Sequence, residues 1–274
     1  MDIKVIINAD DFGMSETVND AIIDGCNNGI ITAASIMANM PAFDDAVQNL
    51  QCVSKIGLAV HLNIIEGKAL IPNTSLCDSE GNFNLSFGQI MLKSFSPEFL
   101  KDVENEFRAQ IEKVLKFAMP DNLDSHVHVH AIPAIFNLVC KLAKEYNIPC
   151  VRTQYEHLYN TPKHAENFSK KHCINFVKVF LLDFFTLINK IFVMKYKLKT
   201  NDCVIGVGYT AMMNEQTIDF GLKKHERKKC LLEVICHPDK NMERKSNYNE
   251  YNAVTSRKLK NLIYYFNPTD FSKI

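Results

Sequence analysis

The stretch Lys4-Val5-Ile6-Ile7-Asn8-Ala9-Asp10-Asp11-Phe12-Gly13 decides the fold of this 274-residue chain. Its apolar run, Lys4–Asn8, predicts a buried β-strand, and two adjacent acids follow where that strand ends. Gly13 and Ser15 then supply a turn former and a helix cap, and Glu16–Asn27 predicts a helix. A strand that leads directly into a helix is the first half of a βα unit.

The same alternation continues along the chain, with a second clear helix start at Ser96-Pro97-Glu98. Repeated βα units predict a parallel sheet, closed as a barrel or doubly wound. No stretch resembles a linker, so we expect one domain over residues 1–274. Both architectures place their sites at the carboxyl ends of strands. The further predicted strands are Thr32–Ala38, Ile56–Asn63, Leu123–His130, Cys150–Gln154, Cys203–Val207 and Leu232–Cys236.

Composition is that of an ordinary globular enzyme, with 47% hydrophobic and 23% charged residues. The 31 basic and 31 acidic side chains cancel, which predicts no nucleic-acid partner. Nine cysteines without a C-x-x-C pair indicate reduced thiols. Met1–Ile7 lacks the layout of a signal peptide, so we expect a cytoplasmic protein.

Residues 174–194 form the most apolar segment of the chain. Lys178, Asp183 and Lys190 interrupt it, which disfavours a membrane span. The polar residues gather within less than half a helical turn, and the remainder is a wide apolar band. We expect a helix whose band is buried against the barrel or a second subunit; peripheral contact with a membrane surface is the alternative.

The run Asp124-Ser125-His126-Val127-His128-Val129-His130 holds three of the nine histidines. Its valines favour a β-strand, on which alternate side chains share one face. Asp124 and the three histidines would then form a polar row. Such a row needs hydrogen bonds or a ligand, and imidazole is the commonest metal ligand in proteins.

Other predicted strand ends also carry acids or bases: the pair Asp10 and Asp11, His61, Arg152, and His237. Each alone has an ordinary structural interpretation, such as a helix cap, a hydrogen-bonded histidine or an ion pair. Together they predict a hydrolytic metal site, because one carboxylate and two imidazoles with open positions are a recurrent catalytic set.

These motifs resemble the YdjC-like carbohydrate deacetylases over nearly the whole chain. The resemblance implies a distorted TIM-like β/α barrel, often dimeric, that removes acetyl groups from N-acetylated sugars with a divalent metal, magnesium or zinc. The motifs that carry it are Asn8–Gly13, Val18-Asn19 with Asn28-Gly29-Ile30 and Thr32, His61-Leu62-Asn63 with Glu66-Gly67, Asp124–His130 with Pro133, and Cys236-His237-Pro238.

Carried over by matching positions, the resemblance implies that Asp11, His61 and His126 bind the metal. It also implies that Asp10 is the general base and His237 the general acid. The stretch from 155 to 200 matches no motif of the family.

Supporting roles follow for the remaining residues. We expect Arg152 to hold Asp10 ionised and Asp124 to orient His126 from behind. On an ideal strand, His128 would lie roughly 7 Å and His130 roughly 13 Å beyond His126, which predicts supporting or sugar-binding roles for both.

Alternative functions stay open at this point. A metal-dependent phosphoesterase, or another amidohydrolase acting on a glycolipid or small molecule, could use a similar residue set. A glycoside hydrolase needs two carboxylates flanking the scissile bond, and the histidine-rich set disfavours it. A non-catalytic sugar-binding protein would not need these ligands.

Overall fold

The computed structural model describes residues 3–53, 55–161 and 170–274, without the side chains of 170–172. The described strands form a single parallel sheet in the order β5-β4-β3-β2-β1-β7-β6. Apart from Lys4, the residues of these strands are buried, as is usual for parallel strands covered on both faces. The strands are β1 (Lys4–Phe12), β2 (Ala33–Ile36), β3 (Gly57–Leu62), β4 (Asn122–Ser125), β5 (Cys150–Val151), β6 (Cys203–Ile205) and β7 (Leu231–Cys236).

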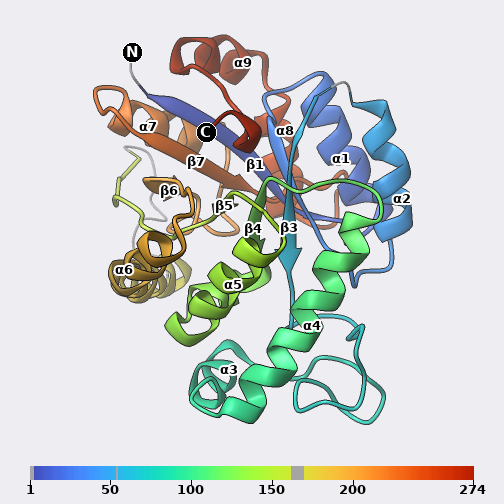
Figure 1. The fold of residues 1–274 in the computed structure, drawn as a ribbon. Helices are drawn as coiled ribbons and strands as arrows, with labels where there is room; N and C mark the ends of the chain where they lie inside the picture. Colours follow the sequence, from blue (N-terminus) through green and yellow to red (C-terminus); the bar gives the residue numbers. More distant parts are fainter. Residues whose placement is uncertain (1–2, 54, 162–169) are drawn as a thin grey trace.

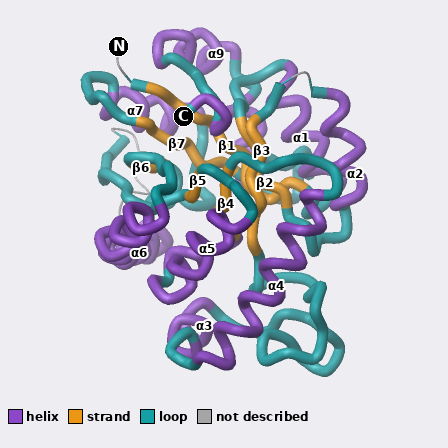
Figure 2. Tube along the Cα trace, in the orientation of Figure 1, coloured by secondary structure: helices purple, strands orange, loops and turns teal. Residues whose placement is uncertain are grey.

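Helices surround this sheet, and the strands lie near the centre of the molecule (Figures 1 and 2). The predicted start of α4 is confirmed: Ser96 caps the helix through Phe99 N, and Pro97 is its first residue. The helices are α1 (Glu16–Asn27), α2 (Phe43–Asn49), α3 (Phe87–Lys93), α4 (Pro97–Leu115), α5 (Pro133–Glu145), α6 (Lys170–Tyr196), α7 (Glu215–His225), α8 (Lys245–Val254) and α9 (Arg257–Ile263).

The sheet curls until its two edge strands nearly meet. Isolated parallel bridges join Cys150 to Lys199 and Glu156 to Val204, which links the β5 edge to the β6 edge. This is the distorted TIM-like α/β architecture predicted from the sequence, with a smaller number of strands than a regular barrel. The domain boundaries, 1 and 274, stay a prediction.

A bulge at the end of β1 sets the direction of the two adjacent acids. The register between β1 and β2 shifts between Ala9 and Phe12, and Asp11 has a left-handed φ of 69°. Strand alternation would place Asp10 and Asp11 on opposite faces. The bulge instead turns both carboxylates toward His61 on β3, a common use of bulges beside active sites.

The predicted strand Leu123–His130 is wrong beyond Ser125. β4 ends there, and His126–Ala131 forms a tight helical turn in which Val127 and His128 have φ values of 52° and 59°. The Ser125 hydroxyl accepts a hydrogen bond from His130 N and so closes the turn. The histidines therefore do not share one strand face.

Helix α6 confirms the predicted helix, but only part of its apolar band is buried. Thr186 and Asn189 face the barrel, where Asn189 donates to the carbonyl of Ala131 and Thr186 accepts from Gln154 N. Buried polar groups of the barrel loops need such partners, so they hold the polar side of α6 inward. Eight apolar side chains are left on the outer side: Ile174, Val177, Phe180, Leu181, Phe184, Leu187, Ile191 and Met194.

Among the described residues, no helix has the length and apolar content needed to span a membrane.

The orientation of α6 predicts a large loss of stability for a substitution on its inner side and a small change for one on its outer side. Asn189→Ala removes the donor to Ala131, so unfolding free energy should fall by about 1–3 kcal/mol. Leu187→Ala, on the exposed side, should change it by less than about 0.5 kcal/mol. Urea denaturation of both variants measures this, and a larger loss for Leu187→Ala would contradict the orientation.

Candidate metal-dependent active site

A cavity of about 220 Å³ lies at the carboxyl ends of the strands and collects most of the predicted site residues. Asp10, His61, His126, His128 and His237 line it, and they come from β1, β3, the turn after β4 and the end of β7. Lys178, Thr210, Asn247 and Glu250 add polar groups to its wall. The prediction that chemical residues meet at strand ends is therefore confirmed for this group.

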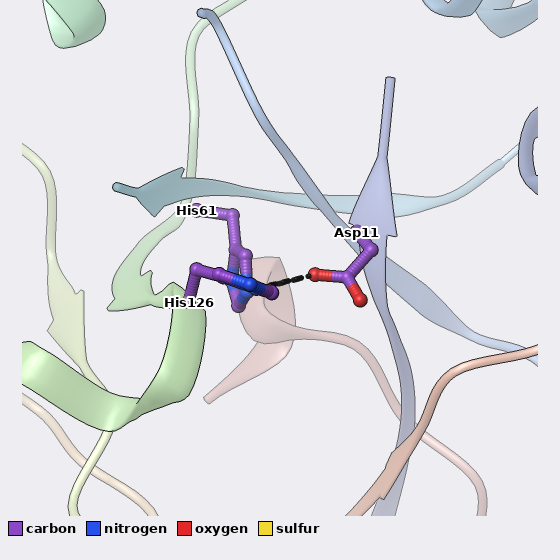
Figure 3. Close-up of side chains that lie close together, drawn as sticks. All are labelled: Asp11, His61 and His126. Atoms are coloured by element: carbon purple, nitrogen blue, oxygen red, sulfur yellow. Dashed lines mark hydrogen bonds and ion pairs between the residues drawn. The ribbon is translucent and has the colours of Figure 1, made fainter. Parts of the chain in front are cut away.

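Asp11, His61 and His126 point toward one another (Figure 3), and the two histidines also line the cavity. Asp11 Oδ1 lies 2.9 Å from His126 Nδ1 and 3.4 Å from His61 Nε2. One ligand atom from each residue lies within 4.8 Å of the others. One carboxylate and two imidazoles form a donor set that suits a divalent cation and leaves coordination positions open.

Asp10, His61 and Asp124 form a second group of similar size, but a buried cation already pairs with its two carboxylates. Arg152 Nη2 lies 2.8 Å from Asp10 Oδ1 and 2.9 Å from Asp124 Oδ2. A metal ion there would have to displace a fully buried guanidinium from its carboxylate partners. The geometry therefore favours one metal position, at Asp11.

Arg152 holds Asp10 ionised, as the sequence predicts. Its Nη1 and Nη2 donate to both Asp10 oxygens, and Asn8 donates a further bond. Burial raises the pKa of Asp10, but the charges of Arg152 and His61 outweigh it and bring the pKa to about 2. Arg152 also pairs with Glu233 on β7, whose pKa burial raises to about 7 against the pull of the guanidinium.

Asp124 orients His61, and the prediction that it orients His126 is wrong. Its Oδ1 lies 2.7 Å from His61 Nδ1, while Asp11 contacts Nδ1 of His126. The reason is that the chain turns after Ser125 and carries His126 away from its strand neighbour. A carboxylate on Nδ1 leaves Nε2 of His61 directed at Asp11, a common arrangement for a metal-binding histidine.

His237 lies on the same cavity and pairs with an acid from α8. Its Nδ1 is 3.6 Å from Glu250 Oε2, and its backbone N donates to that oxygen. Burial lowers the pKa of His237, but Glu250, with Asp11 and Asp10, raises it to about 9. The imidazole is therefore protonated at neutral pH and able to donate a proton.

His128 and His130 differ in kind. His128 lines the cavity, and its buried Nδ1 has no hydrogen-bond partner among the described residues. Burial together with Lys178 keeps the pKa of His128 well below the usual value. It is thus a neutral group available to a ligand. His130 bridges Ser125 Oγ and the Arg152 carbonyl, and burial lowers its pKa to about 4. It braces the backbone that carries Arg152.

Three acids of the site escaped the sequence interpretation: Glu66, Glu233 and Glu250. Glu66 Oε2 lies 3.2 Å from His126 Nε2, at the exposed rim. Glu233 had a readable signal, because it is the one charge within the apolar strand Leu231–Cys236. Glu66 belongs to the sequence motif that runs from His61 to Gly67, so the sequence did mark its position. Nothing in the sequence marked Glu250 as a site residue, because it lies on a polar helix far along the chain.

The other four histidines of the sequence stand in polar or helical surroundings that predict surface positions, and this prediction is wrong for His225. It is buried, with Nδ1 against the Gly221 carbonyl, because helix α7 packs that side inward. His157 is half-buried and stacks on His225. His164 lies outside the described residues, as does the side chain of His172.

The chain is thus a curled β/α barrel with an Asp-His-His group at its strand ends, a donor set that fits a divalent metal. The model of the YdjC-like protein family matches residues 4–264, and the chain belongs to that family.

Named relatives agree with this membership. A carbohydrate deacetylase of Clostridium beijerinckii is 38% identical over 173 residues, which cover 60% of this chain and 69% of that protein. One of Brevibacillus brevis is 38% identical over 168 residues, covering 61% and 64%. One of Geobacillus stearothermophilus is 36% identical over 155 residues, covering 56% and 61%. The chain thus spans about two thirds or less of these relatives' lengths.

A solved structure shares the fold. It is an Enterococcus faecalis protein described as acting in cellobiose-phosphate cleavage, with a TM-score of 0.76 and 23% identity. The match covers 99% of this chain and 98% of that one.

Metal affinity should rank the site residues. We expect His61→Ala and His126→Ala to abolish binding of zinc or manganese in calorimetric titrations. Asp124→Asn should weaken it by roughly 10–100-fold, as is typical when a ligand loses its supporting carboxylate. His157→Ala is the matched control and should bind normally; normal binding by His61→Ala would contradict the assignment.

Proposed function

We propose that this chain is a metal-dependent N-deacetylase of acetylated sugars. The observation that carries the proposal is one cavity in which an anchored carboxylate, Asp10, and a protonated imidazole, His237, flank the Asp11, His61 and His126 group. Membership of the YdjC-like family and the names of the relatives support it. The proposal includes the homodimer and the cytoplasmic location predicted from the sequence.

The reaction adds water to the acetyl carbonyl carbon, breaks the C–N bond and releases acetate and a free amine. A divalent cation, magnesium or zinc, held by Asp11, His61 and His126 would polarise the carbonyl and acidify water. The reaction further needs a base for the water, a proton donor for the leaving nitrogen and groups that position the sugar. Residues of the cavity supply each of these.

Asp10 is placed to take the proton from water. Its pKa of about 2 keeps it in the accepting form across the neutral range. The bidentate bond to Arg152 fixes its direction, so its carboxylate is oriented before a substrate enters. A fixed orientation of this kind avoids the cost of reorganisation during the reaction.

His237 is placed to protonate the departing nitrogen. It is charged at neutral pH, and Glu250, which also lines the cavity, pairs with its Nδ1. His128, with its unpartnered Nδ1, is positioned to contact a sugar hydroxyl.

A phosphoesterase is the weaker candidate. Such enzymes usually need a second metal or a cluster of basic residues. The second cation position is filled by Arg152, which three buried carboxylates already neutralise.

Acetate release from N-acetylglucosamine oligomers, assayed with magnesium, manganese and zinc, tests the proposal. Asp10→Asn removes the base, so turnover should fall by ~10²–10⁴-fold while the metal stays bound. Full activity in this variant would refute the role of Asp10, and metal binding without acetate release from any acetylated sugar would refute the function.

The alkaline limb of the pH profile should report His237. Because the donor must be protonated, kcat/KM should be constant below a pH of about 9 and fall above it. Glu250→Gln removes the charge that raises this pKa, so the fall should begin at lower pH. Glu243→Gln, an exposed neighbour, is the control and should keep the original profile; an unchanged limb in Glu250→Gln would contradict the pairing.

A further inference from the structure

The outer side of α6 presents an unusually apolar surface for a water-exposed helix. Its eight large side chains, Ile174 to Met194, recur at three- and four-residue spacing, and most are more than half exposed. Contiguous apolar patches of this size mark binding surfaces more often than inert ones. Neither the metal group nor the proton-transfer residues use this surface.

The amino-terminal half of this surface forms one wall of a groove. The groove has a volume of about 360 Å³, and its walls come from α6, from Phe87 at the start of α3, and from Val127 in the turn after β4. Val127 and Lys178 also line the catalytic cavity. The groove and the catalytic cavity are therefore adjacent and share a wall.

Among the described residues that line the groove, Lys178 is the one with a charged side chain. It lies where the groove meets the catalytic cavity. Within the described part of the chain it makes no hydrogen bond or ion pair. The acid that acts on its charge, Glu156, is occupied by the backbone N–H groups of Gly206 and Gly208. A partly buried cation without a partner is costly unless an anion meets it.

We propose that the substrate is a glycolipid: an N-acetylated sugar joined through a phosphate to a hydrocarbon chain. The sugar occupies the catalytic cavity, the phosphate meets Lys178, and the hydrocarbon lies in the groove against Val177 and Leu181. This inference rests on the proposed deacetylase function and names the substrate class of the same site.

Two observations favour a lipid over a second copy of the chain in this groove. A subunit packed there would bury Lys178 without an anion in the groove to pair it, whereas a phosphate supplies one. The surface also continues along α6 to exposed lysines at 190, 195 and 197. An apolar helix face flanked by lysines is typical of helices that lie on membrane surfaces, where such a lipid resides.

The hydrocarbon is tested with two diesters of N-acetylglucosamine 1-phosphate, methyl and farnesyl, in the same neutral detergent micelles. They share sugar and charge and differ in the chain alone. We expect kcat/KM for acetate release to be at least ~10-fold higher for the farnesyl diester, since burial contributes about 0.8 kcal/mol per CH₂ group. Equal values would overturn the proposal.

Variants assign this preference to the groove. Val177→Asp places a charge in its wall, so the farnesyl-to-methyl ratio should fall to about one. Tyr264→Glu, equally exposed but on the short turn after α9, is the matched control and should keep the ratio. The proposal is wrong if Val177→Asp keeps the farnesyl-to-methyl ratio. It is also wrong if this variant dissociates a dimer of the chain and leaves the ratio unaltered.

The phosphate is tested separately, by comparing the methyl diester with methyl N-acetylglucosaminide. Lys178→Met should lower this ratio at least tenfold, and Lys178→Arg should restore part of it. A ratio unchanged in Lys178→Met would remove the phosphate from the proposal.

Failure of the deacetylase function itself has a different signature, which is no acetate from any of these compounds. In that case, binding of the two diesters to the metal-free protein is measured by equilibrium dialysis, and the result tests the lipid inference. Retention of the farnesyl diester over the methyl diester, lost in Val177→Asp, would support it, and equal retention would refute it.

Discussion

The buried guanidinium of Arg152 is the interaction on which the site depends. It joins carboxylates from three strands, Asp10 on β1, Asp124 on β4 and Glu233 on β7, and its own backbone follows β5. Without it, each of these three buried carboxylates would lose its guanidinium partner, and a broken buried pair costs about 3–5 kcal/mol. The cation thus ties both sides of the curled sheet together beneath the cavity.

From this centre the order of the site follows outward. Asp124, held by Arg152, fixes His61 through Nδ1, and His61 then faces Asp11. Asp10 is held in the same way, so Asp10 and Asp124 share one support. The guanidinium also pairs with two of the three residues in the other Asp-His group among the described residues, which leaves Asp11, His61 and His126 as the better candidate for a metal.

Helix α6 turns its polar side toward the barrel together with part of its apolar band. Barrel loops end in backbone groups that need hydrogen bonds, and Asn175, Thr186 and Asn189 supply them from α6. A buried unpaired amide or carbonyl costs more than an exposed leucine, so polar side chains turn inward. The apolar surface that results lies beside the catalytic cavity, where it can take part in substrate binding.

The sequence by itself determined the parallel α/β architecture, the positions where the strands begin, and most of the acids and histidines that gather near their carboxyl ends. These features depend on local periodicity, capping and turn residues, which act over a few neighbouring positions. The tertiary structure decided the rest: that a bulge turns both Asp10 and Asp11 inward, that the chain folds back after Ser125, and that Glu250 reaches His237. Such features depend on contacts between residues far apart in the chain, and a pattern of neighbours carries no record of them.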